Sequence, residues 1–285
     1  MSDLSEFIRI SQELGDDMAF VQAGGGNTSQ KIDAKIMAVK SSGSFLRDIT
    51  INKGYCLVNF QEIKKYHNNL PKDELRYSND MNSFVTKGDG RPSMESGFHA
   101  IIPKKYVLHS HPVYLNVLLC SEQGEEILLD LFPYSLFIKA IAPGKDLSME
   151  ILSLLNEGNS REEYVFFLQN HGLITASDDL LACYKTHLEI SNSIKEAYAF
   201  KTFNYMDNQN IHPILFDNNL FPDQIIFSKH EDTKSPGYVE NLSAANYIFT
   251  QINDSKLTPL FLSNELTNYI ASMDSEKYRF NLDQK

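Results

Sequence analysis

The chain has 285 residues, of which 42% are hydrophobic and 22% are charged, and its formal net charge is -11. These proportions indicate a globular protein with one large core, or a domain with an appendage. The negative charge argues against a nucleic acid or an anionic membrane as a partner held by bulk electrostatics, although a basic pocket could bind a small anion. No stretch approaches 18 uninterrupted apolar residues, so no membrane span is predicted.

The cysteines and the N-terminal segment predict a cytoplasmic location. Cys56, Cys120 and Cys183 are odd in number, far apart and without a Cys-x-x-Cys pair. This usage is typical of reduced structural thiols in a cytosolic protein. Residues 1–17 alternate acidic and apolar side chains and lack the apolar core and cleavage signal of a secretory leader.

In the first third of the chain we expect one helix and two strands. Apolar residues between Leu4 and Leu14 recur at helical spacing. Residues 22–32 (QAGGGNTSQKI) are interpreted as a loop of three glycines followed by small polar residues. Residues 35–43 and 54–60 are predicted as strands, and the polar, mixed residues 62–90 receive no assignment.

The middle of the chain predicts a helix between strands. Residues 91–102 (RPSMESGFHAII) are interpreted as a loop that enters a helix with Ser93 as its N-cap. Residues 105–111 (KYVLHSH) predict a strand, and Pro112 suits the first turn of a helix that follows. Residues 163–176 (EYVFFLQNHGLITA) predict one nearly continuous apolar strand, interrupted by Asn170, His171 and Gly172.

Residues 177–200 carry the clearest helical pattern in the chain. Ser177 or Asp178 is the expected cap. The expected apolar stripe consists of Leu181, Tyr184, Leu188, Ser191 and Ile194. We therefore expect a long helix after the apolar strand.

The remaining residues predict one short strand and two helices. The strand is expected within residues 220–230 (LFPDQIIFSKH), and the helices within 241–252 and 263–280. Several links are short, so the alternation predicts an α/β fold with a mostly antiparallel or mixed central sheet. No linker divides the chain, so we expect a catalytic domain over residues 1–230 and a helical C-terminal extension over residues 231–285 packed on it.

Three histidines form the most informative pattern. Residues i and i+2 of a strand point to one face, so His109 and His111 present two imidazoles together while Ser110 turns away. His171 interrupts an apolar segment, where burying an unpaired polar group costs free energy. Three imidazoles suit a catalytic zinc ion, which takes three protein ligands and keeps a fourth position open. Ordinary polar or core histidines are the alternative.

A carboxylate and two loops of small residues are further candidates. Glu95 precedes the histidine strand, and a carboxylate near a divalent cation can be a ligand or a general base. It could instead simply favour the positive end of its helix. The loops at residues 24–29 and 40–44 could bind a phosphate or carboxylate through backbone N–H groups, or could be plain turns. Lys40 adds a positive charge, and neither loop is a Walker or dinucleotide motif.

Five segments, taken together, resemble the class II aldolase/adducin-head family. They are GGGNTS, VKSSGSF, RPSMESGFHAIIP, VLHSHP and LQNHGLI, in the family's order over about residues 22–176. The later segments LFPDQIIF and MDSEKYRF are similar to the aldolase half of bifunctional rhamnulose-phosphate aldolase/dehydrogenases. The resemblance implies a three-layer α/β fold with a central, mostly antiparallel sheet flanked by helices. It also implies a cyclic homotetramer with the active site between subunits.

The resemblance also implies residue roles. It makes His109, His111 and His171 ligands of Zn²⁺, with Mn²⁺ or Co²⁺ as alternatives, and makes Glu95 the catalytic acid/base. The positions that hold the substrate phosphate in sugar-phosphate aldolases are matched by Asn27, Ser42, Gly43 and Ser93.

Two features depart from the family pattern. Aldolases for phosphorylated ketoses commonly have two hydroxyl residues before the catalytic glutamate, whereas this chain has Ser93 and Met94, so one phosphate donor is missing. The family also takes a tyrosine proton donor from the neighbouring chain, and none of the 14 tyrosines is matched to that role.

The function implied is that of a metal-dependent class II aldolase that cleaves or forms a C–C bond of a ketose or ketose phosphate through a zinc-stabilised enediolate. Alternatives within the family are a sugar-phosphate 4-epimerase and a 3-keto sugar-acid phosphate decarboxylase, which use the same chemistry. Epimerases usually carry aspartate at the position of Glu95, so this glutamate favours carbon–carbon cleavage over epimerisation. Met94, in place of a second hydroxyl residue, leaves the decarboxylase as an alternative. A non-catalytic adducin-type binding head is a further alternative, although such heads generally lack the histidines.

Overall fold

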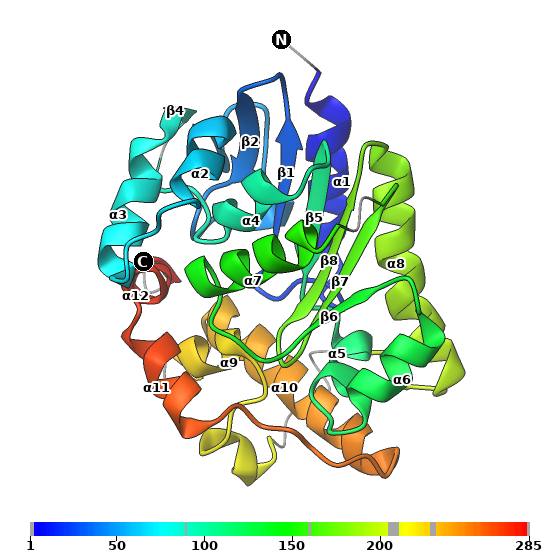
Figure 1. The fold of residues 1–285 in the computed structure, drawn as a ribbon. Coiled ribbons are helices and arrows are strands. Elements are labelled where there is room, and N and C mark those ends of the chain that lie inside the picture. Colours follow the sequence, from blue (N-terminus) through cyan, green and yellow to red (C-terminus); the bar gives the residue numbers. More distant parts are fainter. Residues whose placement is uncertain (1–2, 89, 159–160, 205–210, 229–231, 284–285) are drawn as a thin grey trace.

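The computed structural model describes residues 3–88, 90–158, 161–204, 211–228 and 232–283. Within them one sheet consists of β1 (Asn27–Lys31), β2 (Ile36–Lys40), β3 (Tyr55–Asn59), β4 (Val85–Gly88), β5 (Tyr106–Ser110), β6 (Leu136–Ile138), β7 (Tyr164–Leu168) and β8 (Gly172–Ser177). The strand order is β4-β3-β2-β1-β5-β8-β7-β6 (Figure 1). All neighbouring strands are antiparallel except β6 and β7, which are parallel.

Helices cover both faces of the sheet because its strands alternate buried side chains between two cores. In β5, Val107 packs in the core beneath α4 (Ser96–Ile101) and α7 (Lys145–Asn156), and Leu108 packs in the core on the other face. The second core contains residues of α1 (Ser5–Asp16), α5 (Val113–Leu119) and α8 (Leu180–Ala197). The predicted three-layer α/β fold with a mostly antiparallel sheet flanked by helices is confirmed.

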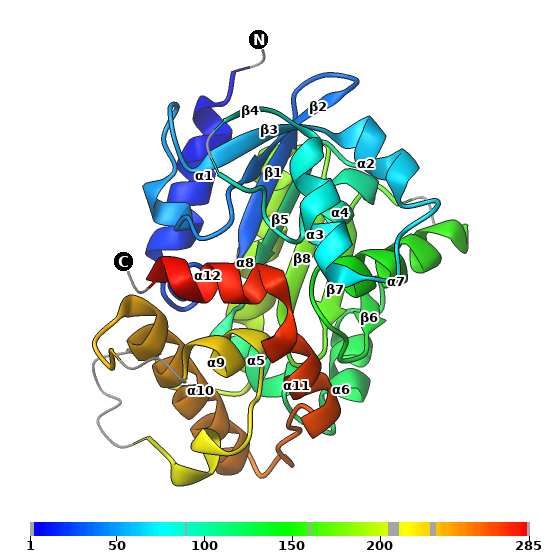
Figure 2. The same cartoon turned by 90° about the vertical axis from the view of Figure 1, so that its left-hand side faces the viewer.

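The remaining helices complete these layers, and two of them, at residues 60–66 and 74–83, pack on β2 and β3 in a third buried cluster. They are α2 (Phe60–Tyr66), α3 (Glu74–Ser83), α6 (Gly124–Leu131), α9 (Pro222–Phe227), α10 (Pro236–Asp254), α11 (Asn264–Ser272) and α12 (Asp274–Asp283), with 3-10 turns at Leu46–Asp48 and Pro213–Phe216. Figure 2 shows α9, α10, α11 and α12 gathered at one end of the sheet. There α10 packs on α5 and α9, while α12 packs on α3 and α9. In the ranges described above, no helix is both long enough and apolar enough to cross a membrane.

Two predicted elements differ in detail from the structure. The single strand predicted over residues 163–176 is an antiparallel hairpin of β7 and β8, because the polar residues between them form a turn in which Asn170 has a φ of 55°. The cap of α8 is Asp179, whose Oδ1 accepts hydrogen bonds from two backbone N–H groups. Most of the predicted apolar stripe is confirmed, because Ser191 and Ile194 are buried and Tyr184 and Leu188 pack partly buried on the core. Leu181 is the exception: it is 61% exposed, and Leu180 is buried instead.

The strand predicted within residues 220–230 is wrong. Its described part is the helix α9, which begins with Pro222 at a first-turn position and Asp223 in the acidic first turn. These two start signals outweigh the apolar run that suggested a strand. Helix prediction over residues 263–280 was correct in type, but Met273 has an extended conformation and divides the segment into α11 and α12.

Two loop assignments also need correction. Residues 27–31 of the predicted glycine loop are β1, paired with β2 and β5. Ser93 is not a helix cap, because α4 begins at Ser96 with Glu95 as its N-cap. The predicted boundary between residues 230 and 231 lies outside the described residues, so the division into a catalytic domain and an extension stays a prediction.

Candidate metal and substrate site

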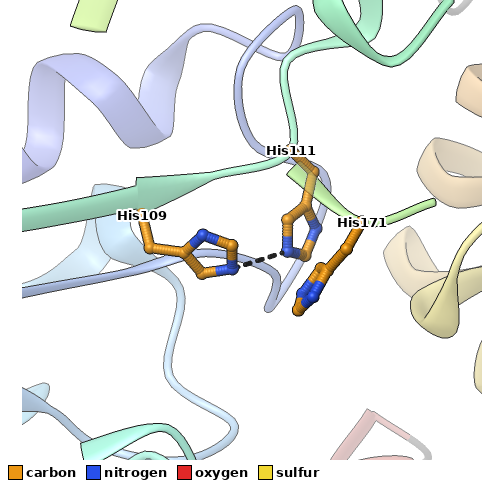
Figure 3. Close-up of side chains that lie close together, drawn as sticks. All are labelled: His109, His111 and His171. Carbon is orange, nitrogen blue, oxygen red and sulfur yellow. Dashed lines mark hydrogen bonds between the residues drawn. The ribbon is translucent and has the colours of Figure 1, made fainter. Parts of the chain in front are cut away.

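The three predicted histidines converge at one end of the sheet. His109 is in β5, His111 follows its end, and His171 lies in the turn between β7 and β8. The antiparallel pairing of β5 with β8 places Ser110 opposite Leu173, which brings this turn beside the end of β5. The ring centroids are 4.9 to 5.1 Å apart, and one ligand atom from each ring lies within 4.8 Å of the others (Figure 3).

The protonation of His109 and His171 favours a bound cation. Nδ1 of His109 lies 2.9 Å from the carbonyl oxygen of Leu173, which can only accept, so Nε2 carries the lone pair. Burial is the main cause that lowers the pKa of His109 to about 4, and burial also lowers the pKa of His171 well below its usual value. Neutral imidazoles are the form that binds a metal. Nε2 of His109 and Nε2 of His111 are 3.2 Å apart, a separation that suits two lone pairs directed at one ion.

Glu95 lies directly beside the histidines. Its Oε2 is 3.4 Å from Nε2 of His109, and its Oε1 is 3.7 Å from Nε2 of His171. Nδ2 of Asn27 donates to Oε2 of Glu95 over 2.7 Å, and Oδ1 of Asn27 accepts from Nε2 of His99 over 2.5 Å. The amide thus holds the carboxylate against the histidines.

A cavity beside the histidines unites the residues that sequence analysis singled out from separate motifs. Its empty volume is about 390 Å³, including open solvent. The predicted site residues that line it are Asn27, Ser42, Gly43, Ser93, Glu95, His111 and His171. His109 is fully buried behind them. Lys40 also lines the cavity, and its Nζ donates to the carbonyl oxygens of Gly24 and Gly26 over 2.6 and 2.8 Å.

Three charged residues of this cavity were missed by sequence analysis. Asp223 of α9 and Glu276 and Arg279 of α12 line the same space. Oδ2 of Asp223 is 3.3 Å from Nδ1 of His111, Oδ1 of Asp223 is 2.8 Å from Nη2 of Arg279, and Nη1 of Arg279 donates to Oε2 of Glu276 over 2.9 Å. Successive contacts between charged side chains therefore connect the candidate ligand His111 with α12.

The environment of Asp223 keeps its carboxylate ionised. Burial would raise the pKa of Asp223, but the Arg279 guanidinium and the neighbouring His111 ring outweigh burial and lower that pKa below its usual range. The approach of Asp223 to His111 needs Gly25, because an added Cβ there would lie 2.8 Å from Oδ2 of Asp223 and 3.0 Å from Nδ1 of His111. The central glycine of the loop thus leaves room for this pair.

Comparison with known proteins identifies the family. Residues 5–198 match the family described as Class II Aldolase and Adducin N-terminal domain, so the chain belongs to the class II aldolase/adducin family. It is 28% identical over 187 residues to L-fuculose phosphate aldolase of Methanocaldococcus jannaschii, covering 64% of this chain and 88% of that protein. It is 27% identical over 201 residues to the uncharacterized oxidoreductase YuxG of Bacillus subtilis, covering 66% of this chain but only 28% of that protein.

A solved structure supports the fold. The N-terminal class II aldolase domain of a conserved protein from Thermoplasma acidophilum superposes with a TM-score of 0.61 at 23% identity, covering 69% of this chain and 93% of that chain. Asp223, Glu276 and Arg279 lie beyond the residues that match the family. The cavity therefore combines the family's segments with side chains from outside them.

Proposed function

We propose that the protein is a zinc-dependent aldolase that cleaves or forms a C–C bond of a ketose or ketose phosphate through an enediolate. The observation that carries this proposal is the position of Glu95 beside three converging imidazoles at the edge of one cavity. His109, His111 and His171 are the proposed ligands, with Mn²⁺ or Co²⁺ as alternatives to Zn²⁺. A bound zinc ion would supply a Lewis acid that withdraws electron density from a carbonyl group.

The protein's own groups have separate tasks in this proposal. Glu95 transfers the proton at the carbon next to the carbonyl, in either direction of the reaction. Ser42, Gly43 and Ser93 hold an anionic part of the substrate through hydroxyl and backbone N–H donors. Asn27 is assigned to the same binding site, and its present contact also positions Glu95. Lys40 provides a neighbouring positive charge when protonated.

Metal analysis and product analysis test the proposal. Purified protein is expected to contain one zinc ion per chain, and His109→Ala is expected to lose it. L-fuculose 1-phosphate, the substrate class named in a relative, is the first probe for release of an aldehyde. Stoichiometric zinc in His109→Ala would contradict the ligand assignment, and protein that binds no metal would favour a non-catalytic adducin-type head.

A decarboxylase is the second candidate, and Met94 is the observation that favours it. Met94 lines the cavity directly beside Ser93, so an apolar side chain stands where a second hydroxyl donor is common in aldolases. Release of carbon dioxide from a 3-keto sugar-acid phosphate, without aldehyde from a ketose phosphate, would select this alternative. Epimerisation of a pentulose phosphate would select the 4-epimerase.

We also propose that the protein forms a homotetramer whose sites lie between subunits, as the family resemblance implies. Light scattering coupled to size-exclusion chromatography tests this assembly. A mass equal to one chain of 32.5 kDa would contradict it.

A further inference from the structure

Glu276 is a buried acid that faces the cavity with one oxygen unsatisfied. The residue is 0% exposed and lines the cavity together with Glu95, His111 and His171. Its Oε2 accepts from Arg279, whereas its Oε1 has no hydrogen-bond partner among the described residues. A buried polar atom without a partner costs free energy, so an unpaired oxygen at a cavity wall indicates a group that contacts a ligand.

Its surroundings make Glu276 suited to proton transfer near neutral pH. Burial is the largest effect and raises the pKa of Glu276 to about 7; Arg279 opposes the increase, and the charges of Asp223 and Glu95 add to it. Both forms of the carboxyl group are then populated under physiological conditions, as a general acid or base requires. Neighbouring Asp223 stays ionised, so two carboxyl groups of one site differ in protonation.

Aldol cleavage needs a proton transfer that Glu95 does not perform. One transfer occurs at the carbon next to the carbonyl, which is the task assigned to Glu95. The other occurs at the hydroxyl oxygen of the adjacent carbon, which becomes the oxygen of the released aldehyde. Within the described part of this chain, Glu276 offers the cavity an unpaired oxygen that can take this second proton.

We propose that Glu276 is a second catalytic residue, which transfers the proton of the substrate hydroxyl; this inference rests on the proposed function. In cleavage, the Glu276 carboxylate accepts the hydroxyl proton, and the O–H electron pair forms the carbonyl bond of the aldehyde. The C–C bond breaks, and its electron pair passes into the enediolate, which Glu95 then protonates at carbon. Each turnover leaves Glu276 protonated and Glu95 deprotonated, and exchange with solvent restores both. Synthesis follows the same steps in reverse, without oxidation or reduction.

Charged groups on α12 and on neighbouring elements bear on this assignment, and Arg91 pairs with Asp274 at the start of the helix over 2.9 Å. Glu276 is faced by Arg279 of its own helix, by Asp223 of α9 and by Glu95 at the start of α4. At the start of α12, Glu74 of α3 accepts hydrogen bonds from the backbone N–H of Asp274 over 3.2 Å and from Oγ of Ser275 over 3.1 Å. Glu74 therefore anchors the same helix but is outside the set of described residues that line the cavity, which makes Glu74→Gln a matched control.

Two reactions separate the proposed roles of Glu276 and Glu95. Exchange of carbon-bound hydrogen of dihydroxyacetone phosphate with D₂O, followed by NMR, needs proton transfer at carbon only. Cleavage of L-fuculose 1-phosphate needs both transfers. Glu276→Gln is expected to keep zinc and exchange but to lose cleavage by about 10²–10⁴-fold, the usual contribution of a general acid or base. Glu95→Gln is expected to lose both reactions, whereas the control Glu74→Gln is expected to keep both.

An infrared measurement tests the Glu276 carboxyl group without any turnover. The difference spectrum between wild type and Glu276→Gln is expected to contain a protonated-carboxyl band at pH 6 that disappears by pH 8. Unchanged cleavage in Glu276→Gln, parallel loss of exchange and cleavage, or absence of the band would each overturn the inference. Wild-type protein without zinc or exchange would overturn the proposed function itself, so the two failures are distinguishable.

Discussion

Oδ2 of Asp223 lies 3.3 Å from Nδ1 of His111, while Oδ1 of the same carboxylate lies 2.8 Å from Nη2 of Arg279. Histidines that bind metals commonly donate their other ring N–H to a carboxylate, which fixes the tautomer and the orientation of the ring. Asp223 is in α9 and Arg279 is in α12, so helices beyond the family match place a carboxylate beside a proposed zinc ligand.

Asp223→Asn is expected to weaken zinc binding by about 10–100-fold, the range for loss of such an outer carboxylate. Asparagine keeps the shape but removes the negative charge beside the His111 ring. Competition with a chelator of known affinity measures the effect. Asp178→Asn is the control, because Asp178 pairs with Lys104 at the surface, and equal affinities in all three proteins would refute this role of Asp223.

Glu95→Gln is expected to keep its zinc but to lower turnover by about 10²–10⁴-fold. Glutamine retains the size of the side chain and can still accept from Asn27, but it does not take up a proton. Turnover and metal content are measured on the same preparation. Turnover equal to that of wild type would remove Glu95 from the mechanism.

Gly43→Ala is expected to lower the free energy of unfolding by about 1–2 kcal/mol, the cost of a side chain in the left-handed region. Gly43 has a φ of 78°, and an added Cβ would lie 2.2 Å from Cδ1 of Leu282 in α12. Urea denaturation of Gly43→Ala, Leu282→Ala and the double variant separates backbone strain from this contact. A loss that vanishes in the Leu282→Ala background would show that the contact, and not the backbone, is responsible.

His187 is expected to make the fold sensitive to acid. Burial, followed by the charge of His109, lowers the pKa of His187 to about 3, from 6.5. Between pH 6.5 and 3 the unfolded chain binds one more proton at this residue, so its contribution to stability falls as the pH decreases, by up to about 1.4 kcal/mol per pH unit. Above pH 6.5 it adds no pH dependence.

The comparison for His187 is made with His187→Gln in metal-free protein, by urea denaturation at several pH values. The ring nitrogens of His187 lie 2.6 Å from Oγ of Ser110 and 2.9 Å from Oγ1 of Thr175, and glutamine can replace part of this bonding. The variant is expected to lose stability less steeply below pH 6.5. Identical slopes in both proteins would contradict the prediction.

The sequence sufficed for the layers of the fold and for the residues around the histidines, because both depend on local patterns. Two-residue spacing predicted that His109 and His111 share a face, and the interruption of an apolar segment indicated His171. The family motifs then assigned roles to these histidines and to Glu95. The position of Asp223 in the site was not predicted, because its segment has the composition of a strand. Pro222 and Asp223 are nevertheless signals of a helix start. Glu276 and Arg279 reach the cavity only through the packing of α12 on α3 and α9, which no local pattern reveals.

The hairpin turn that carries His171 has a practical consequence for recombinant work. Nδ2 of Asn170 donates to the carbonyl oxygens of Leu220 and Leu260 over 2.9 and 2.7 Å. A fragment trimmed to the family limits at residue 198 would contain every proposed zinc ligand and yet lack both of these acceptors. Expression plasmids for the minimal catalyst should therefore be designed around the hydrogen bonds of this turn and not around the edges of an alignment.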